Sequence, residues 1–299
     1  FRNGKKVEEP KTASTLLGKT INGAWDLTLG EAKSDADKVQ RAKKSDQYAE
    51  IAADTVSAIP KVGTVAGSLS RGVLLADMSG NGGATGFASK FALDTMQGAA
   101  LNRVGKFGAA SAEKYMAAGA QTTLGAEMKM HFVTGSAFGA TKAVFNPHTY
   151  VDKEGKFSTS ATASNLALGT GVGGVLSMPA GYLGLRVTRA SSLMLGTSAE
   201  MSVSRSIMQN TVSNASGGFA SGFVFGGVEA SREDLSLGHV TRGAIEGGVI
   251  GMLTGGAMGA ARISYIDWPA LVGARLRLEV TVMLSPGCSP RCWRSAPIV

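Results

Sequence analysis

The residues best suited to metal binding or nucleophilic chemistry are three histidines and two cysteines in a chain of 299 residues. His131 follows Glu127 by four residues, a spacing that puts the two side chains on one face of a helix. Two candidate ligands do not make a metal site, and the chain contains no His-Glu-x-x-His motif. Cys288 and Cys292 lack a second cysteine pair and a nearby histidine. We therefore expect no metal site, and we interpret Glu127 with His131 as a pair on a helix surface.

Gly169, Gly171 and Gly174 match the G-x-G-x-x-G pattern of dinucleotide-binding proteins. That motif needs a preceding strand, so that the glycines turn into a helix whose N-terminus holds the pyrophosphate. The residues upstream, Ser158 to Ser164, are small and polar instead. A phosphate-binding G-x-x-x-x-G-K-[ST] loop and a G-x-S-x-G nucleophile turn are also absent from the sequence. These observations predict a protein that is not an enzyme and has no cofactor.

The most specific signal in the sequence is a small residue at every fourth position, in three stretches. In a helix this spacing aligns the small residues in one stripe, against which another backbone can lie closely. Glycine inside a helix costs about 1 kcal/mol relative to alanine, so close packing has to recover the loss. We therefore predict helix-packing roles for Gly169, Gly173, Ser177 and Gly181, for Gly218, Gly222 and Gly226, and for Gly247, Gly251, Gly255 and Gly259.

The composition favours a mostly α-helical fold. Aromatic residues make up only 6% of the chain and there are 41 glycines, whereas a strand-rich sandwich needs more β-branched and aromatic residues. The predicted architecture is a set of antiparallel helical hairpins packed through Gly/Ala/Ser stripes. One small β-hairpin is expected near residues 149–158, because Pro147 ends a helix and Asp152 to Gly155 is typical of a turn.

The net charge of +8 is compatible with a nucleic-acid partner only if the basic residues cluster. They do not: the excess is distributed thinly along the chain, without a basic run and without interleaved aromatic residues. We therefore expect no nucleic-acid partner.

The sequence divides by composition into four regions. They are a polar extension or linker at 1–47, small-residue helices at 48–106, a duplicated helical-hairpin region at 107–262 with units of about 107–185 and 190–262, and a divergent tail at 263–299.

The duplication rests on two sets of matches. The tripeptide Ser-Ala-Glu occurs at 111–113 and again at 198–200, an offset of 87, whereas the ladders that begin at Gly169 and Gly247 are 78 positions apart. The connection in the second unit is therefore nine residues shorter, as expected where loops vary. That connection, Glu229 to Gly238, is charged and predicts a hairpin tip that faces water.

The two ends of the chain differ from its middle. The last 37 residues contain both cysteines and four of the eight prolines, and the small-residue repeat does not continue into them. We expect this tail to lie outside the fold, and an out-of-frame end would account for its composition. Because the chain begins with Phe rather than Met, we expect a fragment of a larger protein, and the style of its repeats suggests a bacterial one.

A membrane-inserting protein is the alternative to a soluble helical array. Ser158 to Leu185 contains no charge for 28 residues and Ser206 to Val228 none for 23, both long enough to span a bilayer. These glycine ladders resemble those of membrane-active bacterial proteins and pore-forming hairpins, a resemblance that covers the ladder helices alone. Against insertion, both stretches are rich in polar residues and the mean hydropathy of the chain is +0.09.

We interpret the sequence as a non-enzymatic structural or interaction region of a larger protein. Its expected partners are other helices of the same or a neighbouring chain. The second hypothesis, membrane-inserting hairpins of a toxin, effector or translocation protein, adds the membrane as a partner. Cell-surface, secreted and membrane-associated locations are all compatible with this sequence.

Overall fold

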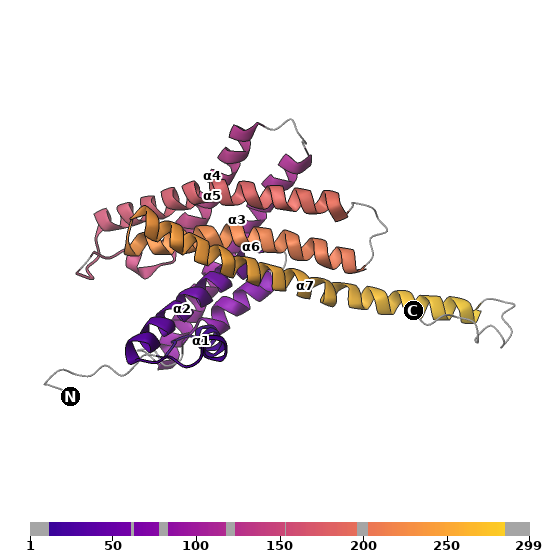
Figure 1. Cartoon of the computed structure of the whole chain (residues 1–299), viewed down its shortest axis with the longest axis horizontal. Coiled ribbons are helices and arrows are strands. Elements are labelled where there is room, and N and C mark those ends of the chain that lie inside the picture. Colours follow the sequence, from indigo (N-terminus) through magenta and orange to yellow (C-terminus); the bar gives the residue numbers. More distant parts are fainter. Residues whose placement is uncertain are drawn as a thin grey trace.

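The computed structural model describes residues 12–60, 63–77, 83–117, 123–152, 154–195 and 203–284. Its α-helices are α1 (Leu16–Leu29), α2 (Asp35–Ala58), α3 (Gly83–Ala117), α4 (Leu124–Val144), α5 (Thr159–Leu195), α6 (Val203–Glu233) and α7 (Leu237–Leu284). No strand forms within the described residues, so the prediction of a mostly α-helical fold is confirmed. Figure 1 shows the long helices α5, α6 and α7 running side by side, with α1 and α2 projecting below this layer.

The polar N-terminal region is helical from Leu16 onward. Thr15 caps α1, because its side chain accepts a hydrogen bond from the Gly18 amide, and Ser34 caps α2 in the same way through the Asp37 amide. Gly30 lies between the two helices with φ of 75°, a left-handed conformation that favours glycine. The boundary expected near residue 47 falls inside α2, and that helix ends just before Pro60.

The chain returns from α2 to α3 through two π-helical segments, η1 (Gly63–Gly67) and η2 (Ser70–Leu74). They lie directly on α2: a Cβ atom at Gly67 would be only 2.6 Å from the Cα atom of Ser57. The same close contact recurs where Gly105 of α3 meets the backbone of Ala58. Glycine at these positions lets the backbones touch and brings Arg71 of η2 next to α2.

The β-hairpin predicted near residues 149–158 does not form. Pro147–Thr149 is instead a 3-10 turn (η4), which Asn146 caps through the His148 amide. A single antiparallel bridge joins Val151 to Phe157. Between them the Asp152 carboxylate accepts hydrogen bonds from the backbone amides of the turn, and this local network leaves too few residues for two strands.

The two C-terminal helices, α6 and α7, are joined by a connection of three residues, Asp234 to Ser236. Most of the charged segment predicted as a connection at Glu229–Gly238 is therefore helical, since α6 continues through Glu233. The backbone of the expected tail is helical up to Leu284, in the part of α7 that Figure 1 shows extending beyond the other helices. The remainder of the tail, like the Ser-Ala-Glu match at 198–200, lies outside the described residues.

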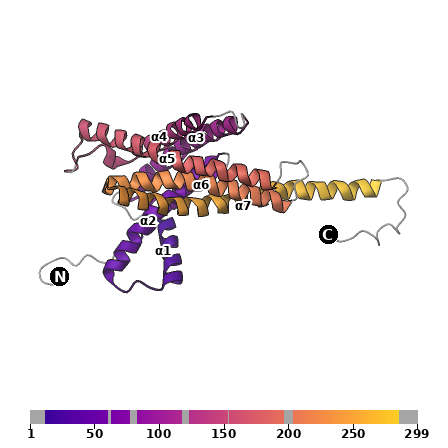
Figure 2. The same ribbon diagram turned by 45° about the horizontal axis from the view of Figure 1, so that its top comes forward.

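The main hydrophobic core lies where α2, α3, α4 and α6 meet. Its centre is the edge-to-face contact of Phe138 with Phe225, whose ring centroids are 5.4 Å apart. The other buried members are aliphatic: Ile51, Ala58, Leu101, Val224 and Val228. Figure 2 shows this junction from a second direction, with α2 approaching the α6–α7 layer from below.

Candidate functional site

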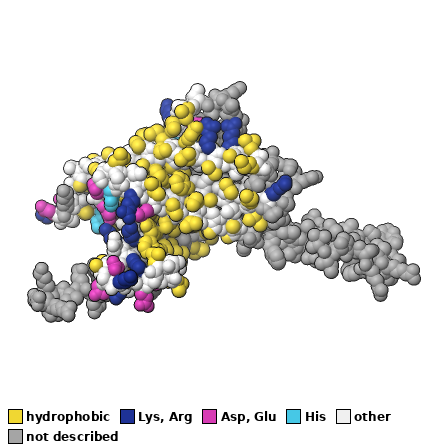
Figure 3. Space-filling view, viewed as in Figure 1, with side chains coloured by type: hydrophobic (Ala, Val, Ile, Leu, Met, Phe, Trp, Pro, Cys, Tyr) yellow, Lys and Arg dark blue, Asp and Glu magenta, His cyan; other side chains and the backbone are white. Residues whose placement is uncertain are grey.

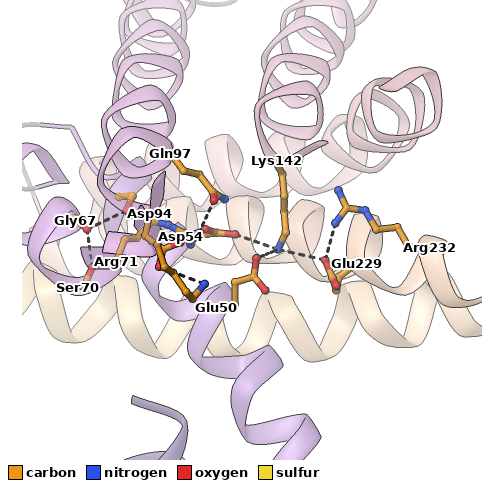
Figure 4. A network of polar contacts seen from close by, with 12 residues as sticks. Glu50, Asp54, Gly67, Ser70, Arg71, Asp94, Gln97, Lys142, Glu229 and Arg232 are labelled. Atoms are coloured by element: carbon orange, nitrogen blue, oxygen red, sulfur yellow. Dashed lines mark hydrogen bonds and ion pairs between the residues drawn. The ribbon is translucent and has the colours of Figure 1, made fainter. Parts of the chain in front are cut away.

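A buried lysine connects three helices beside this core. The Nζ atom of Lys142 in α4 lies 3.1 Å from Asp54 Oδ2, 3.5 Å from Glu50 Oε1 and 3.6 Å from Glu229 Oε2. Its side chain is only 1% exposed, and the Nζ atom lies over the ring of Phe225, 5.8 Å from the ring centroid. Figure 4 shows the ammonium group among carboxylates from α2 and α6. One side chain of α4 therefore makes ion pairs with both neighbouring helices.

Arg71 continues the network toward α3. Its guanidinium forms an ion pair with Asp54, donates a hydrogen bond of 2.6 Å to Gln97 Oε1 and lies 3.9 Å from Asp94 Oδ1. Lys90 in turn lies 3.4 Å from Asp94 Oδ2. Asp54 is shared between Arg71 and Lys142, so it links the η2 segment and α4 through α2 (Figure 4).

The charges in this network balance. Burial alone would raise the pKa of Glu50, but the positive charges of Lys142, Arg71 and Arg232 hold it below its usual value. Burial would lower the pKa of Lys142, yet the surrounding carboxylates hold it above its usual range. Both groups are therefore charged at neutral pH. The lowered pKa of Glu50 and the raised pKa of Lys142 favour a structural role for this pair over acid–base chemistry near pH 7, whereas burial raises the pKa of Asp94 at the α3 end of the network.

This network is not among the residues predicted from the sequence. One signal was available, because Lys142 is a single charge within a stretch of small and apolar residues, and buried charges are rare unless paired. Its partners could not be identified in the same way. The sequence places Glu229 in a charged connection that faces water, and it does not distinguish Glu50 and Asp54 from the rest of the helices predicted at 48–106.

The predicted ladder residues of α6 and α7 lie opposite one another. A Cβ atom at Gly222 would be 2.9 Å from the Cα atom of Gly251, and one at Gly251 would be 2.9 Å from the Cα atom of Gly222. The same reciprocal relation holds for Gly226 with Gly247, at 2.9 and 2.8 Å. Real Cβ atoms essentially never come so close, so these positions accept only glycine without a shift of the helices.

The backbones of α6 and α7 are also close to each other at the two ends of this interface. Cβ atoms at Gly218 and Gly255 would each be 3.1 Å from the Cα atom of the other residue. A Cβ at Gly259 would meet the carbonyl oxygen of Asn210 at 2.6 Å. The structure thus brings together two of the three predicted stretches.

The third predicted stretch lies against α4. Gly173 faces Gly139, where a Cβ on Gly173 would be 3.0 Å from the opposite Cα atom. A Cβ on Gly169 would lie 3.0 Å from the Gly139 carbonyl oxygen, and Ser177 packs against Gly135. Gly181 lies against the ring of His131. The glycines of α4 therefore belong to the same type of contact, although they were not among the predicted packing residues.

The Glu127–His131 pair is not on a helix surface as predicted. Glu127 is buried and lies 3.9 Å from Arg186 of α5, and His131 is half-buried against Gly181. Burial lowers the pKa of His131 despite the nearby Glu127 carboxylate. The described residues contain no cluster of three or more potential metal ligands.

The G-x-G-x-x-G match lies in the interior of α5, where Gly169 and Gly174 both face α4. This placement differs from the strand-to-helix turn of a dinucleotide site. Comparisons with protein-family models, with curated proteins and with solved structures give no match for this chain, so its function has to be argued from the residues themselves.

Proposed function

We propose that this chain is a non-enzymatic structural or interaction region whose antiparallel helical hairpins pack through Gly/Ala/Ser stripes. The observation that carries the proposal is the reciprocal fit of Gly222 and Gly251, where the backbones of α6 and α7 approach without intervening side chains. Glycine weakens each isolated helix, so such a helix depends on its neighbour for stability.

The duplicated units predicted at about 107–185 and 190–262 correspond in this proposal to the hairpins α4–α5 and α6–α7. Both have a glycine ladder in the second helix that faces glycines of the first. In both, contacts run antiparallel: Gly135 meets Gly173 while Gly139 meets Gly169, just as Gly222 meets Gly251 and Gly226 meets Gly247. The Lys142 network would then fix how the first helices of the two units lie against α2.

The outer face of the α5–α7 layer supports an interaction role. Exposed apolar side chains of α7 recur at helical spacing on the side away from its glycine ladder: Ile245, Val249, Met252 and Leu253. Figure 3 shows a broad apolar band on this side of the molecule, with charged side chains gathered mainly at one end. Single exposed apolar residues are common on protein surfaces, whereas a contiguous apolar band is typical of an interaction site. The partner that we propose for this band is a helix of a neighbouring chain.

Vesicle flotation of the full chain tests this proposal. A soluble or surface-associated array stays in the dense fraction, or is released from vesicles by carbonate at high pH. Flotation that resists carbonate extraction would contradict it.

Membrane insertion is the second candidate function, and one observation favours it. Helix α5 contains the one described segment that could cross a bilayer by length and composition, Thr159–Met194, whose most apolar 18-residue window has a mean hydropathy of 1.3 and is 28% buried. Glycine ladders also pack helices inside lipid, where they let backbones approach. Val175 is an exposed apolar residue of α5, so Val175→Glu places a charge on its surface. This candidate is supported if the unchanged chain floats with vesicles after carbonate treatment and the variant does not.

A further inference from the structure

Helix α5 contains no acidic residue, and its only charged residues are two arginines near its C-terminal end, Arg186 and Arg189. The sides of the helix that carry Gly173 and Gly184 pack against α4 and α6. The remaining side is exposed and apolar over the C-terminal half of the helix. Its large apolar residues, each 48–86% exposed, are Val175, Leu183, Val187, Leu193 and Met194. This exposed face of α5 therefore combines hydrocarbon with positive charge and has no carboxylate.

The neighbouring helices extend the exposed face of α5. Phe132 of α4 lies over Gly174 of α5, where an added Cβ atom would meet the ring at 2.7 Å, and Phe132 is itself 39% exposed. Lys129 precedes Phe132 by about one turn of α4 and is exposed as well. On the other side, Arg205 is exposed about one turn before Gln209, whose amide donates a hydrogen bond to α5. One further basic side chain therefore flanks α5 on each side.

The fold brings together basic residues that are far apart in the sequence. Residues 103–131 contain four basic and two acidic residues, and residues 186–205 contain three basic residues and one acidic residue. One of these acids, Glu127, is buried 3.9 Å from Arg186. Lys129 and Arg205 form no ion pair with any residue that the structure describes. Figure 3 shows Lys and Arg side chains next to the apolar band at its upper edge, so an anionic partner is favoured.

The exposed hydrocarbon decides the class of this anionic partner. At a lipid surface, apolar side chains enter the boundary between head groups and acyl chains, while lysine and arginine reach the phosphates. Nucleic acid offers the same phosphates but no apolar layer for side chains such as Leu193 and Met194. We infer that the exposed face of α5 lies flat on an anionic lipid surface, with Lys129, Arg189 and Arg205 at the phosphate groups.

This inference rests on the surface-associated form of the proposed function, because α5 stays packed between α4 and α6 rather than crossing the bilayer. It concerns a different surface from the apolar stripe of α7, since α6 lies between α5 and α7 (Figure 1). The lipid surface and the proposed helix of a neighbouring chain are therefore separate partners, and each can be tested without the other.

Co-flotation with two kinds of vesicle tests the inference, one of phosphatidylcholine alone and one of phosphatidylcholine mixed equally with phosphatidylglycerol. At about 0.1 M NaCl we expect binding to the mixed vesicles to be at least about ten-fold tighter than to the neutral ones. A rise to about 1 M NaCl shortens the Debye length from about 10 Å to about 3 Å and should release the protein. Carbonate at high pH should release it as well.

The double variant Lys129→Gln/Arg205→Gln removes two charges from the face without breaking an ion pair among the described residues. It should weaken binding to the mixed vesicles at least about ten-fold, because each basic residue near an anionic surface contributes about five-fold. Its control is Lys33→Gln/Lys38→Gln, which removes the same charge from exposed positions at and just before the start of α2. Because α2 projects below the layer, the control should bind within about two-fold of the unchanged chain (Figure 1).

A second pair of variants tests the apolar part. Leu193→Asn/Met194→Asn changes side chains that are 78% and 86% exposed and should weaken binding at least about five-fold. Leu235→Asn/Leu237→Asn, at residues 63% and 83% exposed between α6 and α7, should leave it unchanged. Circular dichroism of all four double variants should match that of the unchanged chain.

Three results would each overturn the inference: no binding to the mixed vesicles, equal binding to both kinds of vesicle, or equal binding by the variants and their controls. These results would leave the proposed packing of helices in place. Carbonate-resistant flotation would overturn both, because it would show insertion into the bilayer rather than binding at its surface.

Discussion

The ammonium group of Lys142 lies 3.1 Å from the carboxylate of Asp54, and the two side chains are 1% and 0% exposed. The pair joins α4 to α2 across 88 positions of sequence and is itself buried, while the neighbouring carboxylates of Glu50 and Glu229 are 36% and 26% exposed. Such a pair adds little stability relative to a well-packed apolar replacement of both partners. Removal of one partner is different, because it leaves the other charge buried without compensation.

Lys142→Met should therefore lower the free energy of unfolding by about 3–5 kcal/mol, measured by urea denaturation at pH 7. Methionine keeps much of the side-chain volume, so the loss reports the charge rather than a cavity. The matched control is Lys156→Met, because Lys156 pairs with Glu154 at the surface, where the side chains are 76% and 72% exposed. The control should change stability by no more than about 0.5 kcal/mol. Equal stability of the two variants would show that the Lys142 network does not hold the helices together.

The same network predicts how stability depends on pH. Burial alone would raise the pKa of Glu50, but Lys142, Arg71 and Arg232 outweigh it and keep the folded-state pKa below the ordinary 4.5. A carboxyl with a lower pKa in the folded state stabilises the fold above the unfolded-state pKa, and this contribution is lost as the pH falls through the folded-state pKa. The Tm should therefore drop more steeply below about pH 4.5 in the unchanged chain than in Glu50→Gln.

Thermal melts between pH 7 and pH 3 measure this difference. Glu154→Gln, which changes an exposed acid, serves as the control and should keep the slope of the unchanged chain. Parallel pH profiles for all three proteins would contradict the assignment of Glu50 to the network.

Local patterns in the sequence predicted the helical class, while the tertiary contacts required the structure. Four-residue spacing identified residues such as Gly222 and Gly251, because helical periodicity is a local property. Spacing alone could not show that these two residues face each other, nor that Gly139 belongs to a similar interface. The link from Lys142 to Asp54 was equally inaccessible, since it depends on how α2 crosses α4 and α6.

The π-helical segments and the missing β-hairpin have different physical reasons, a tertiary contact in the first case and a local one in the second. Gly67 of the first π-helical segment packs directly against Ser57 of α2. The sequence of residues 63–74 does not reveal this contact, because it depends on a residue outside the segment. At 149–158, Asp152 satisfies the turn amides with its own side chain, a local competition that alternation of residue types does not reveal.

The glycine ladder predicts a sharp difference between two chemically identical substitutions. Gly251→Leu places a Cβ against the backbone of Gly218 and within 2.9 Å of the Gly222 Cα atom, so α6 and α7 must separate. We expect a loss of about 3 kcal/mol or more, beyond the usual cost of overpacking because backbone rather than side chain has to move. Gly255→Leu should behave similarly, since its Cβ would meet the Gly218 Cα atom at 3.1 Å.

Gly171→Leu provides the control for this prediction, because a Cβ at Gly171 has no neighbour within 4 Å. It should leave the protein as stable as before or raise stability by up to about 1 kcal/mol, through improved helix propensity. Thermal melting followed by circular dichroism distinguishes these outcomes. Unchanged melting of both Gly251→Leu and Gly255→Leu would refute packing through the glycine stripe.

Asp46 is expected to hold α1 against α2. Its carboxylate accepts hydrogen bonds from the Ser14 amide at 2.9 Å, from the Ser14 hydroxyl at 2.8 Å and from the Thr15 amide at 3.2 Å. Asp46→Ala removes the carboxylate that accepts these three hydrogen bonds just before α1, where backbone amides have no partner within the helix. We expect the free energy of local opening of α1 to fall by about 1–2 kcal/mol, with the global Tm little changed.

Hydrogen exchange of residues 16–29 measures this local opening. Exchange should be about ten-fold faster in Asp46→Ala and unchanged in Asp37→Ala, a substitution in the exposed first turn of α2. Equal exchange of α1 in the two variants would mean that its apolar contacts with α2 suffice to hold it.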